Sequence, residues 1–255
     1  MARWVRFDAA GRYGGGAFDG KGIVEWQGDM FANPHQTGRQ VALTDVRLLP
    51  PCAPSKMIGL WNNFRERAER EKLHRPEHPL YFLKSSNSFA GDGDRIRRPA
   101  GYSGPVVFEG ELGIVIGSRC SGASPEEARQ AIFGYTCVND VTARDLLRQD
   151  PAFVHWTRAK SFVGFGVFGP AIATDLDAGT LWVRTLVNGE ERQNYPVTDM
   201  FFSPVEIVSR LSADMTLEPG DLIACGTSVG AGPMQDGDTV EVAIDGIGSL
   251  INLFG

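Results

Sequence analysis

Two tight-turn dipeptides limit the folds that this chain can adopt. The strand-forming segment Val183–Val187 runs directly into Asn188-Gly189, and Thr239–Ile244 runs into Asp245-Gly246. Because Asn, Asp and Gly tolerate positive φ, each pair predicts a two-residue hairpin between antiparallel strands. Most of the sequence outside three short helices also has strand character. The chain is therefore predicted to be a β-dominated α+β protein and not an alternating β-α-β chain.

The three helices are predicted from the residues that would cap them. Ser124-Pro-Glu-Glu127 and Ser203-Pro-Val-Glu206 each place a glutamate three residues after a serine, with a proline in the first turn. Both are capping boxes, which satisfy the free N–H groups at a helix N-terminus. Gly134 is expected to end the first of these helices. A third helix is predicted to begin at Asn63 and to reach Leu73.

A proline-rich stretch divides the chain into two parts. Leu48-Leu-Pro-Pro-Cys-Ala-Pro54 can form neither a helix nor a central strand, so it is the best candidate for a linker. Brief apolar runs broken by Gly and polar residues predict a small β-rich module over residues 1–50. Residues 51–255 are predicted to form the larger domain.

The composition of the 255 residues excludes several classes of protein. A net charge of −6 and a pI near 5.3 argue against a nucleic-acid-binding surface. No apolar run approaches the ~18 residues that cross a membrane, and no signal peptide is recognisable. The four scattered cysteines form neither a zinc motif nor a disulfide framework. A cytoplasmic protein without nucleic-acid or membrane partners is expected.

Three carboxylates are the strongest indication of a functional site. Glu109 and Glu111 are predicted to share one face of a strand over Val106–Ile116, with Cα atoms ~7 Å apart. Such carboxylates repel each other unless a cation lies between them or one is protonated. Asp140 ends a second predicted strand, Gly134–Asp140, and adds a third hard oxygen ligand, which suits Mg²⁺ or Mn²⁺. The alternative is a solvated edge strand that binds nothing.

Lys160 is the candidate for proton transfer. It lies in Thr157-Arg-Ala-Lys-Ser-Phe162, where small and apolar residues flank it. A partly buried ammonium group in this setting can neutralise developing negative charge or move a proton.

Several motifs in one order make the chain similar to the fumarylacetoacetate hydrolase family. They extend from about residue 55 to the C-terminus, and the first 50 residues contribute little. Each motif is weak alone, so their order and spacing carry the resemblance. The motifs are Gly59-Leu-Trp-Asn-Asn-Phe64, Phe82-Leu-Lys84, Glu109-Gly-Glu111, Gly134-Tyr-Thr136, Asn139-Asp-Val-Thr-Ala-Arg-Asp145, Lys160-Ser-Phe162 and Leu217-Glu-Pro-Gly-Asp-Leu-Ile-Ala-Cys-Gly-Thr227.

The resemblance implies a fold, a site and an assembly. It implies a mixed β-roll or barrel catalytic domain that usually forms a homodimer. It assigns Mg²⁺ or Mn²⁺ to the three carboxylates and places Lys160 beside a small 2-oxo-acid substrate. It also places Thr227 against the substrate carboxylate and Lys84 among the substrate-binding side chains.

Three departures from the family pattern concern the reaction. Hydrolases and decarboxylases of this family usually carry a His and a Glu on a mobile lid, and the corresponding positions here are Arg67 and Arg70. Leu147 replaces a glutamine, and Val163 replaces an aspartate. The first two departures remove groups that position or activate water. The two arginines, on a predicted lid over residues 63–80, suggest instead that a second substrate carboxylate is recognised.

These features favour isomerisation or decarboxylation of a 2-oxo dicarboxylate. The expected types are a 5-carboxymethyl-2-hydroxymuconate isomerase or a 2-oxo-acid decarboxylase, since both reactions begin with a metal-polarised 2-oxo acid. An acylpyruvate hydrolase, which cleaves a C–C bond, is the close alternative. A metal-binding protein that has lost catalysis is the other alternative, supported by the altered lid motif and opposed by the retained Lys160.

Overall fold

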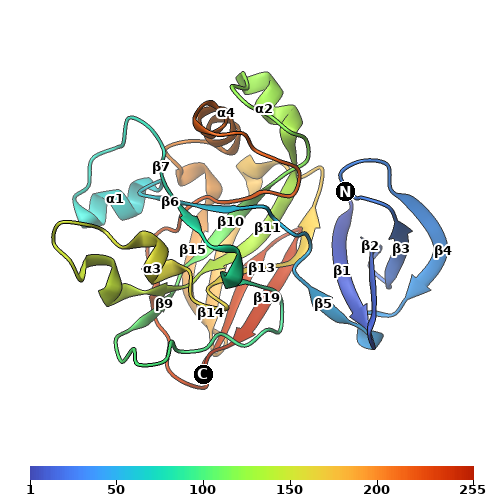
Figure 1. Cartoon of the computed structure of the whole chain (residues 1–255), viewed down its shortest axis with the longest axis horizontal. Helices are drawn as coiled ribbons and strands as arrows, with labels where there is room; N and C mark the ends of the chain where they lie inside the picture. The colour runs from blue at the N-terminus through green and yellow to red at the C-terminus, as the bar shows by residue number, and fades with distance from the viewer.

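A large mixed β-sheet dominates the computed structural model, which describes all residues 1–255 (Figure 1). It has 12 strands, and its main path runs β4-β3-β2-β1-β13-β11-β10-β16-β6-β7, with β5 paired to β1 and β8 to β13. The prediction of a β-dominated α+β fold is confirmed. The strands are β1 Arg3–Ala9, β2 Arg12–Phe18, β3 Ile23–Gln27, β4 His35–Val41, β5 Arg47–Leu49, β6 Met57–Trp61, β7 Leu80–Lys84, β8 Phe89–Ala90, β10 Gly110–Ile116, β11 Ile132–Asp140, β13 Gly166–Ala173 and β16 Leu222–Ala224.

Two smaller sheets complete the strand framework. One has the order β12-β9-β17, and the other has the order β15-β14-β18-β19. The second packs against β10, β11 and β13 of the large sheet, and the main hydrophobic core contains residues from both. This packing fixes the centre of the large sheet, where β10 and β11 lie side by side. The strands are β9 Val106–Phe108, β12 Thr142–Ala143, β17 Gly232–Pro233, β14 Trp182–Val187, β15 Glu190–Pro196, β18 Thr239–Ile244 and β19 Gly248–Leu253.

The two helices predicted from capping boxes are confirmed. Helix α2 spans Pro125–Ala131 and α4 spans Pro204–Asp214, and both have the reciprocal serine–glutamate bonds of a capping box. Gly134 does not end α2, because the chain passes directly into β11 at Ile132 and Gly134 lies within that strand. None of the helices has the length and hydrophobicity of a membrane-spanning segment.

The helix predicted from Asn63 begins later than expected. Helix α1 spans Arg65–Glu71, with Phe64 at its N-cap position. The Asn63 side chain instead donates to the carbonyl of Cys225 and accepts from the N–H of Phe202, so tertiary contacts replace the predicted cap. A short helix, α3, spans Trp156–Lys160, and a 3₁₀ helix, η3, spans Arg144–Arg148.

One of the two predicted hairpins has the expected turn. Asn188 and Gly189 join β14 to β15 with φ values of 53° and 79°. The connection between β18 and β19 is longer than predicted. Ile244 pairs with Gly248, so three residues, Asp245 to Ile247, form the turn.

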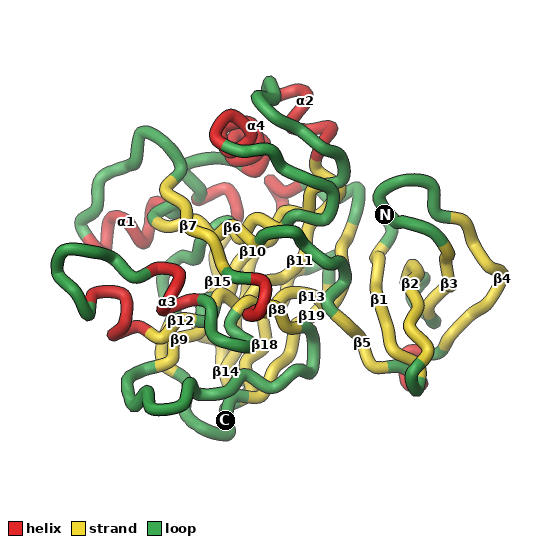
Figure 2. Tube along the Cα trace, viewed as in Figure 1, coloured by secondary structure: helices red, strands yellow, loops and turns green.

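The first five strands stand apart from the rest of the chain (Figure 2). Strand pairing joins them to the larger part only where Arg3 and Trp4 of β1 meet Ala173 and Ile172 of β13. A second contact is aromatic, with the rings of Phe31 and Phe133 4.9 Å apart. This arrangement supports the proposal that residues 1–50 form a module beside residues 51–255.

Candidate active site

Glu109 lies where the chain passes from one sheet to another. Strand β9 ends at Phe108 and β10 begins at Gly110, so the continuous strand predicted over Val106–Ile116 is wrong. The carbonyl of Glu109 accepts from the N–H of Asp140 at 2.9 Å, and its N–H donates to the side chain of Asn139 at 3.1 Å. These two bonds to the end of β11 hold Glu109 beside Asp140 at the break.

The three predicted metal ligands lie together. Carboxylate oxygens of Glu109, Glu111 and Asp140 are all within 4.8 Å of one another. Glu111 and Asp140 are each 1% exposed, and β10 lies between β11 and β16 in the large sheet. The alternative of a solvated edge strand is therefore wrong for Glu111. Burial, and after it the charges of Asp140 and Glu109, raise the pKa of Glu111 well above its ordinary value.

Lys160 bonds two of the three carboxylates. Its Nζ donates to Glu109 at 2.7 Å and to Thr142 Oγ1 at 2.8 Å, and it also bonds Asp140. Burial opposes the charge on Lys160, but the carboxylates of Asp140 and Glu109 outweigh burial and raise its pKa. The ammonium form therefore dominates at neutral pH.

Lys84 lies elsewhere than predicted. Its fully buried side chain bonds Asp140 and reaches the carbonyl of Val141 at 3.4 Å, and no cavity at the site is lined by it. We therefore correct its assignment from substrate binding to support of Asp140. Burial favours the neutral acid of Asp140, but Lys160 and Lys84 outweigh it and hold the pKa below its ordinary value.

The donor set fits a divalent cation. Glu111 forms no ion pair, and its one hydrogen-bond partner is the N–H of Gly226 at 2.8 Å. Both lysines of the cluster bond Asp140, and neither forms an ion pair with Glu111. Hard oxygen donors in this number suit Mg²⁺ or Mn²⁺ and leave positions for water or substrate.

A buried polar network behind the glutamates joins them to Thr227. Thr227 Oγ1 donates to the carbonyl of Gly110 at 2.8 Å and accepts from the amide of Gln193 at 2.8 Å. Gln193 Oε1 in turn accepts from the Gly110 N–H at 3.0 Å, and the Tyr195 hydroxyl also donates to the Gly110 carbonyl. Sequence reasoning missed Gln193 and Tyr195. Their alternation on one face of a strand after the Asn188-Gly189 turn was the available signal.

The two arginines predicted on the lid have different surroundings. Arg67 lines the cavity that contains Glu109, Glu111, Lys160 and Thr227, and its Nε donates to Glu71 at 2.9 Å. Burial opposes its charge, but Glu109 and Glu71 outweigh burial and raise its pKa. Arg70 pairs with Glu66 at 3.1 Å, and its side chain is 67% exposed. It lines only a neighbouring pocket, which does not reach Glu111 or Lys160.

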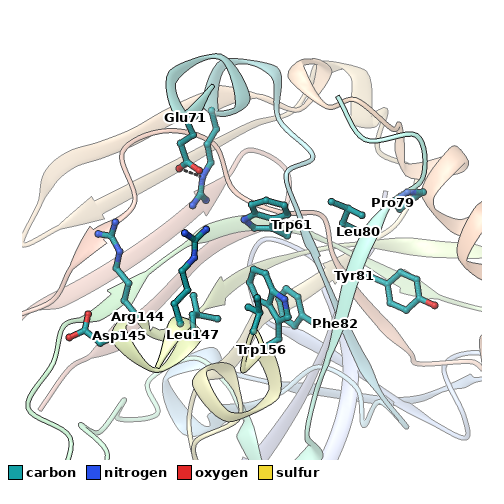
Figure 3. Close-up of a pocket in the computed structure, with 13 residues that line it drawn as sticks. Trp61, Glu71, Pro79, Leu80, Tyr81, Phe82, Arg144, Asp145, Leu147 and Trp156 are labelled. Carbon is teal, nitrogen blue, oxygen red and sulfur yellow. Dashed lines mark hydrogen bonds and ion pairs between the residues drawn. The ribbon is translucent and has the colours of Figure 1, made fainter. Parts of the chain in front are cut away.

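A larger pocket opens beside this cavity (Figure 3). Trp61, Phe82 and Trp156 form one side of it, and Arg144 lies on the other side. Leu147, which replaces the family glutamine, lines both spaces. Val163 is 74% exposed and lines neither. The aromatic residues and Arg144 were within the recognised motifs or adjacent to them, but their convergence depends on tertiary structure.

The fold and the site define a β-rich protein with a buried carboxylate–lysine centre at the base of a cavity. The chain belongs to the fumarylacetoacetate hydrolase family. The profile of the Fumarylacetoacetate (FAA) hydrolase C-terminal family matches residues 56–254, and a profile described as Rv2993c-like, N-terminal, matches residues 2–51. The predicted resemblance is confirmed.

Relatives with named activities match most or all of the chain. A structure of 2-hydroxyhepta-2,4-diene-1,7-dioate isomerase from Mycobacterium marinum is 39% identical with a TM-score of 0.91, covering 100% of this chain and 98% of that one. A structure of 5-carboxymethyl-2-hydroxymuconate delta-isomerase from Mycobacterium smegmatis is 39% identical with a TM-score of 0.90, covering 99% and 98%. Oxaloacetate tautomerase YisK of Bacillus subtilis is 37% identical over 228 residues, covering 84% of this chain and 75% of the relative.

Proposed function

We propose that this chain is a Mg²⁺- or Mn²⁺-dependent enzyme that isomerises or decarboxylates a small 2-oxo or enol dicarboxylate. The observation that carries the proposal is the cluster of Glu109, Glu111 and Asp140 with Lys160 bonded to two of them. The relatives described as isomerases and as a tautomerase support the same type of reaction. Under this proposal the substrate is bound through its carboxylate and 2-oxo oxygens.

Each residue of the site has a defined task in this proposal. Glu109, Glu111 and Asp140 would hold the cation, which when bound supplies Lewis-acid polarisation of the 2-oxo group. Lys160 keeps its proton between Asp140 and Glu109 and presents an N–H to the developing negative charge. In an isomerisation the enol oxygen loses one proton and a carbon atom gains one, so in this proposal the Lys160 ammonium group gives its proton to the carbon atom and regains one from the enol oxygen, with no net change.

The alternative of C–C bond hydrolysis requires a base that activates water. The carboxylate on α1 that lines the pockets at the site is Glu71, and Arg67 engages it at 2.9 Å. The contact with Arg67 occupies this carboxylate, so it is not free to bind and orient a water molecule. This contact favours isomerisation or decarboxylation over hydrolysis.

The proposal is tested with metal-stripped protein to which Mg²⁺ or Mn²⁺ is returned. We would assay enol oxaloacetate, a 2-hydroxymuconate-type diene and an acylpyruvate by ultraviolet absorbance, and measure Mn²⁺ binding by calorimetry. Isomerisation or decarboxylation that requires the metal is expected. Faster cleavage of the acylpyruvate would establish the hydrolase alternative, and Mn²⁺ binding without any turnover would establish loss of catalysis.

Two variants assign the roles within the site. Glu111→Gln should abolish Mn²⁺ binding and activity together, because it removes the carboxylate that has no ion-pair partner. Lys160→Met should abolish activity while Mn²⁺ still binds. Glu69→Gln, an exposed position on α1, is the matched control and should behave as wild type. Full activity of Lys160→Met would contradict the assigned role.

A further inference from the structure

Every N–H of the Lys160 ammonium group already has an acceptor. An ammonium group has three N–H donors, and here they are directed at Glu109, Asp140 and Thr142 Oγ1. The Lys160 side chain is 3% exposed, and its Nζ lies 5.0 Å from the centre of the Phe82 ring. A substrate can therefore receive a hydrogen bond or a proton from Lys160 only in place of one of these three acceptors.

One of the three acceptors differs from the other two. Glu109 and Asp140 are proposed ligands of the cation, so their oxygens would be shared between the cation and Lys160. Thr142 is not among the proposed ligands, and its Oγ1 lies 2.8 Å from Lys160 Nζ in a residue that is 2% exposed. The Thr142 hydroxyl is thus the acceptor of Lys160 that the proposed cation would leave in place.

The Thr142 hydroxyl is held in the orientation that accepts. Thr142 Oγ1 donates its single proton to the carbonyl of Asp140 at 3.1 Å, which leaves only lone pairs for Lys160. The backbone of Thr142 is fixed by the pairing of β12 with β9, where Thr142 lies opposite Val107. The branched side chain is also restricted in its rotation about the Cα–Cβ bond. The position and the polarity of this hydroxyl are therefore both set by the fold.

We infer that Thr142 is a positioning residue, which holds the ammonium group of Lys160 at the site while Glu109 and Asp140 bind the cation. The inference rests on the proposed function and adds a residue that is neither a proposed metal ligand nor a proton donor to the substrate. Without this hydroxyl, one N–H of a buried ammonium group would lack a partner, which is costly, so Lys160 would turn away to find another. The rate of the chemical step should then fall more than the affinity for the substrate.

Thr142→Val tests this role because valine keeps the branched shape and removes the hydroxyl. On Mn²⁺-loaded protein, kcat is measured for whichever of the three assayed substrates wild type converts fastest. It should fall about 10- to 100-fold, the effect expected from losing a hydrogen bond to a charged group, while KM and Mn²⁺ affinity change less than about twofold. Thr142→Ser keeps a hydroxyl and should restore kcat to within about threefold of wild type.

Thr136→Val is the matched control. Thr136 is fully buried, and its Oγ1 donates to the carbonyl of Gly169 at 3.2 Å, so this variant also exchanges a buried threonine for valine and removes a hydrogen bond. The lost bond does not involve Lys160. Thermal unfolding should show that both valine variants are folded, and Thr136→Val should keep the kcat of wild type.

A second measurement does not depend on turnover. Crystal structures of Mn²⁺-loaded wild type and Thr142→Val would show whether Lys160 Nζ stays in place. It should remain within hydrogen-bond distance of Thr142 Oγ1 in wild type, and it should be displaced or disordered in the variant. Four outcomes would each overturn the inference while the proposed function stands: wild-type kcat in Thr142→Val, an equal loss in Thr136→Val, no recovery in Thr142→Ser, or Nζ at one position in both structures. If wild type binds Mn²⁺ but turns over no substrate, the proposed function fails, and the two structures still decide whether Thr142 holds Lys160. Failure of wild type to bind Mn²⁺ would refute both.

Discussion

Replacement of Gln193 by methionine tests how the proposed metal ligands are held in place. Gln193 is 2% exposed, and its amide accepts from the Gly110 N–H and donates to Thr227 Oγ1 and to the carbonyl of Val229 at 3.2 Å. Methionine has a similar length but cannot make these bonds. Since an unsatisfied buried polar group costs about 1–3 kcal/mol, and some of these groups keep a second partner, we expect a loss of about 2–4 kcal/mol.

The consequence should reach both stability and metal affinity. A loss of this size in a chain of this length corresponds to a fall in Tm of about 5–15 °C, measured by calorimetry. Because Gly110 lies between Glu109 and Glu111, Mn²⁺ affinity should also fall, by about tenfold or more, which is ~1.4 kcal/mol. Asn194→Met is the control, since the Asn194 side chain is exposed and bonds only Glu191. A Gln193→Met protein with wild-type Tm and Mn²⁺ affinity would refute the reasoning.

Four further predictions follow from other parts of the structure. Gly110→Ala should strongly destabilise the fold, because the new Cβ would lie 1.9 Å from Thr185 Oγ1. Gly15→Ala is the control, since the atom nearest to its new Cβ is 3.5 Å away, and thermal unfolding should show a lower Tm for the Gly110 variant alone. Hydrogen bonds from Ser203 lower the pKa of the Glu206 carboxyl group from its ordinary value of 4.5. The ionised carboxylate therefore stabilises the fold fully above pH 4.5, and this stabilisation is lost as the pH falls through the lowered pKa. Urea unfolding should therefore show the gap between wild type and Glu206→Gln closing below about pH 4.5. Sedimentation at micromolar concentration should show a homodimer, and a single species near the 27.7 kDa of one chain would exclude it. Hydrogen exchange over residues 63–80 should slow when a substrate analogue is added to Mn²⁺-loaded protein, and unchanged exchange would exclude a lid that closes on the ligand.

Local signals in the sequence predicted local structure well. The capping boxes at Ser124 and Ser203 were correct because all their bonds lie within four residues. The turn at Asn188-Gly189 was correct for the same reason. The predicted start at Asn63 was wrong because its side chain has partners on two distant segments, which no local pattern can indicate.

The sequence was enough to predict which residues form the candidate site, but not which contacts they make. The carboxylates and Lys160 could be identified because their residue types and order are distinctive. The break at Glu109 could not, since it depends on bonds to the end of β11. The role of Lys84 also required the fold, because a lysine on a strand shows no preference for a carboxylate 56 positions away. The larger pocket beside the cavity gathers side chains from five elements, β6, α1, β7, η3 and α3, so it is visible only in three dimensions.

The two lysines that bond Asp140 bear on how the protein would respond to the supply of the proposed metal ion. Both lie against Asp140, and Lys160 also bonds Glu109, so two of the three carboxylates have a counterion whether or not an ion is bound. Some small metal-binding domains fold only when the ion is bound. Here we expect the fold to persist when the ion leaves, so that occupancy can follow metal availability reversibly. The lysines would thus keep the protein folded when it is without the ion and therefore inactive.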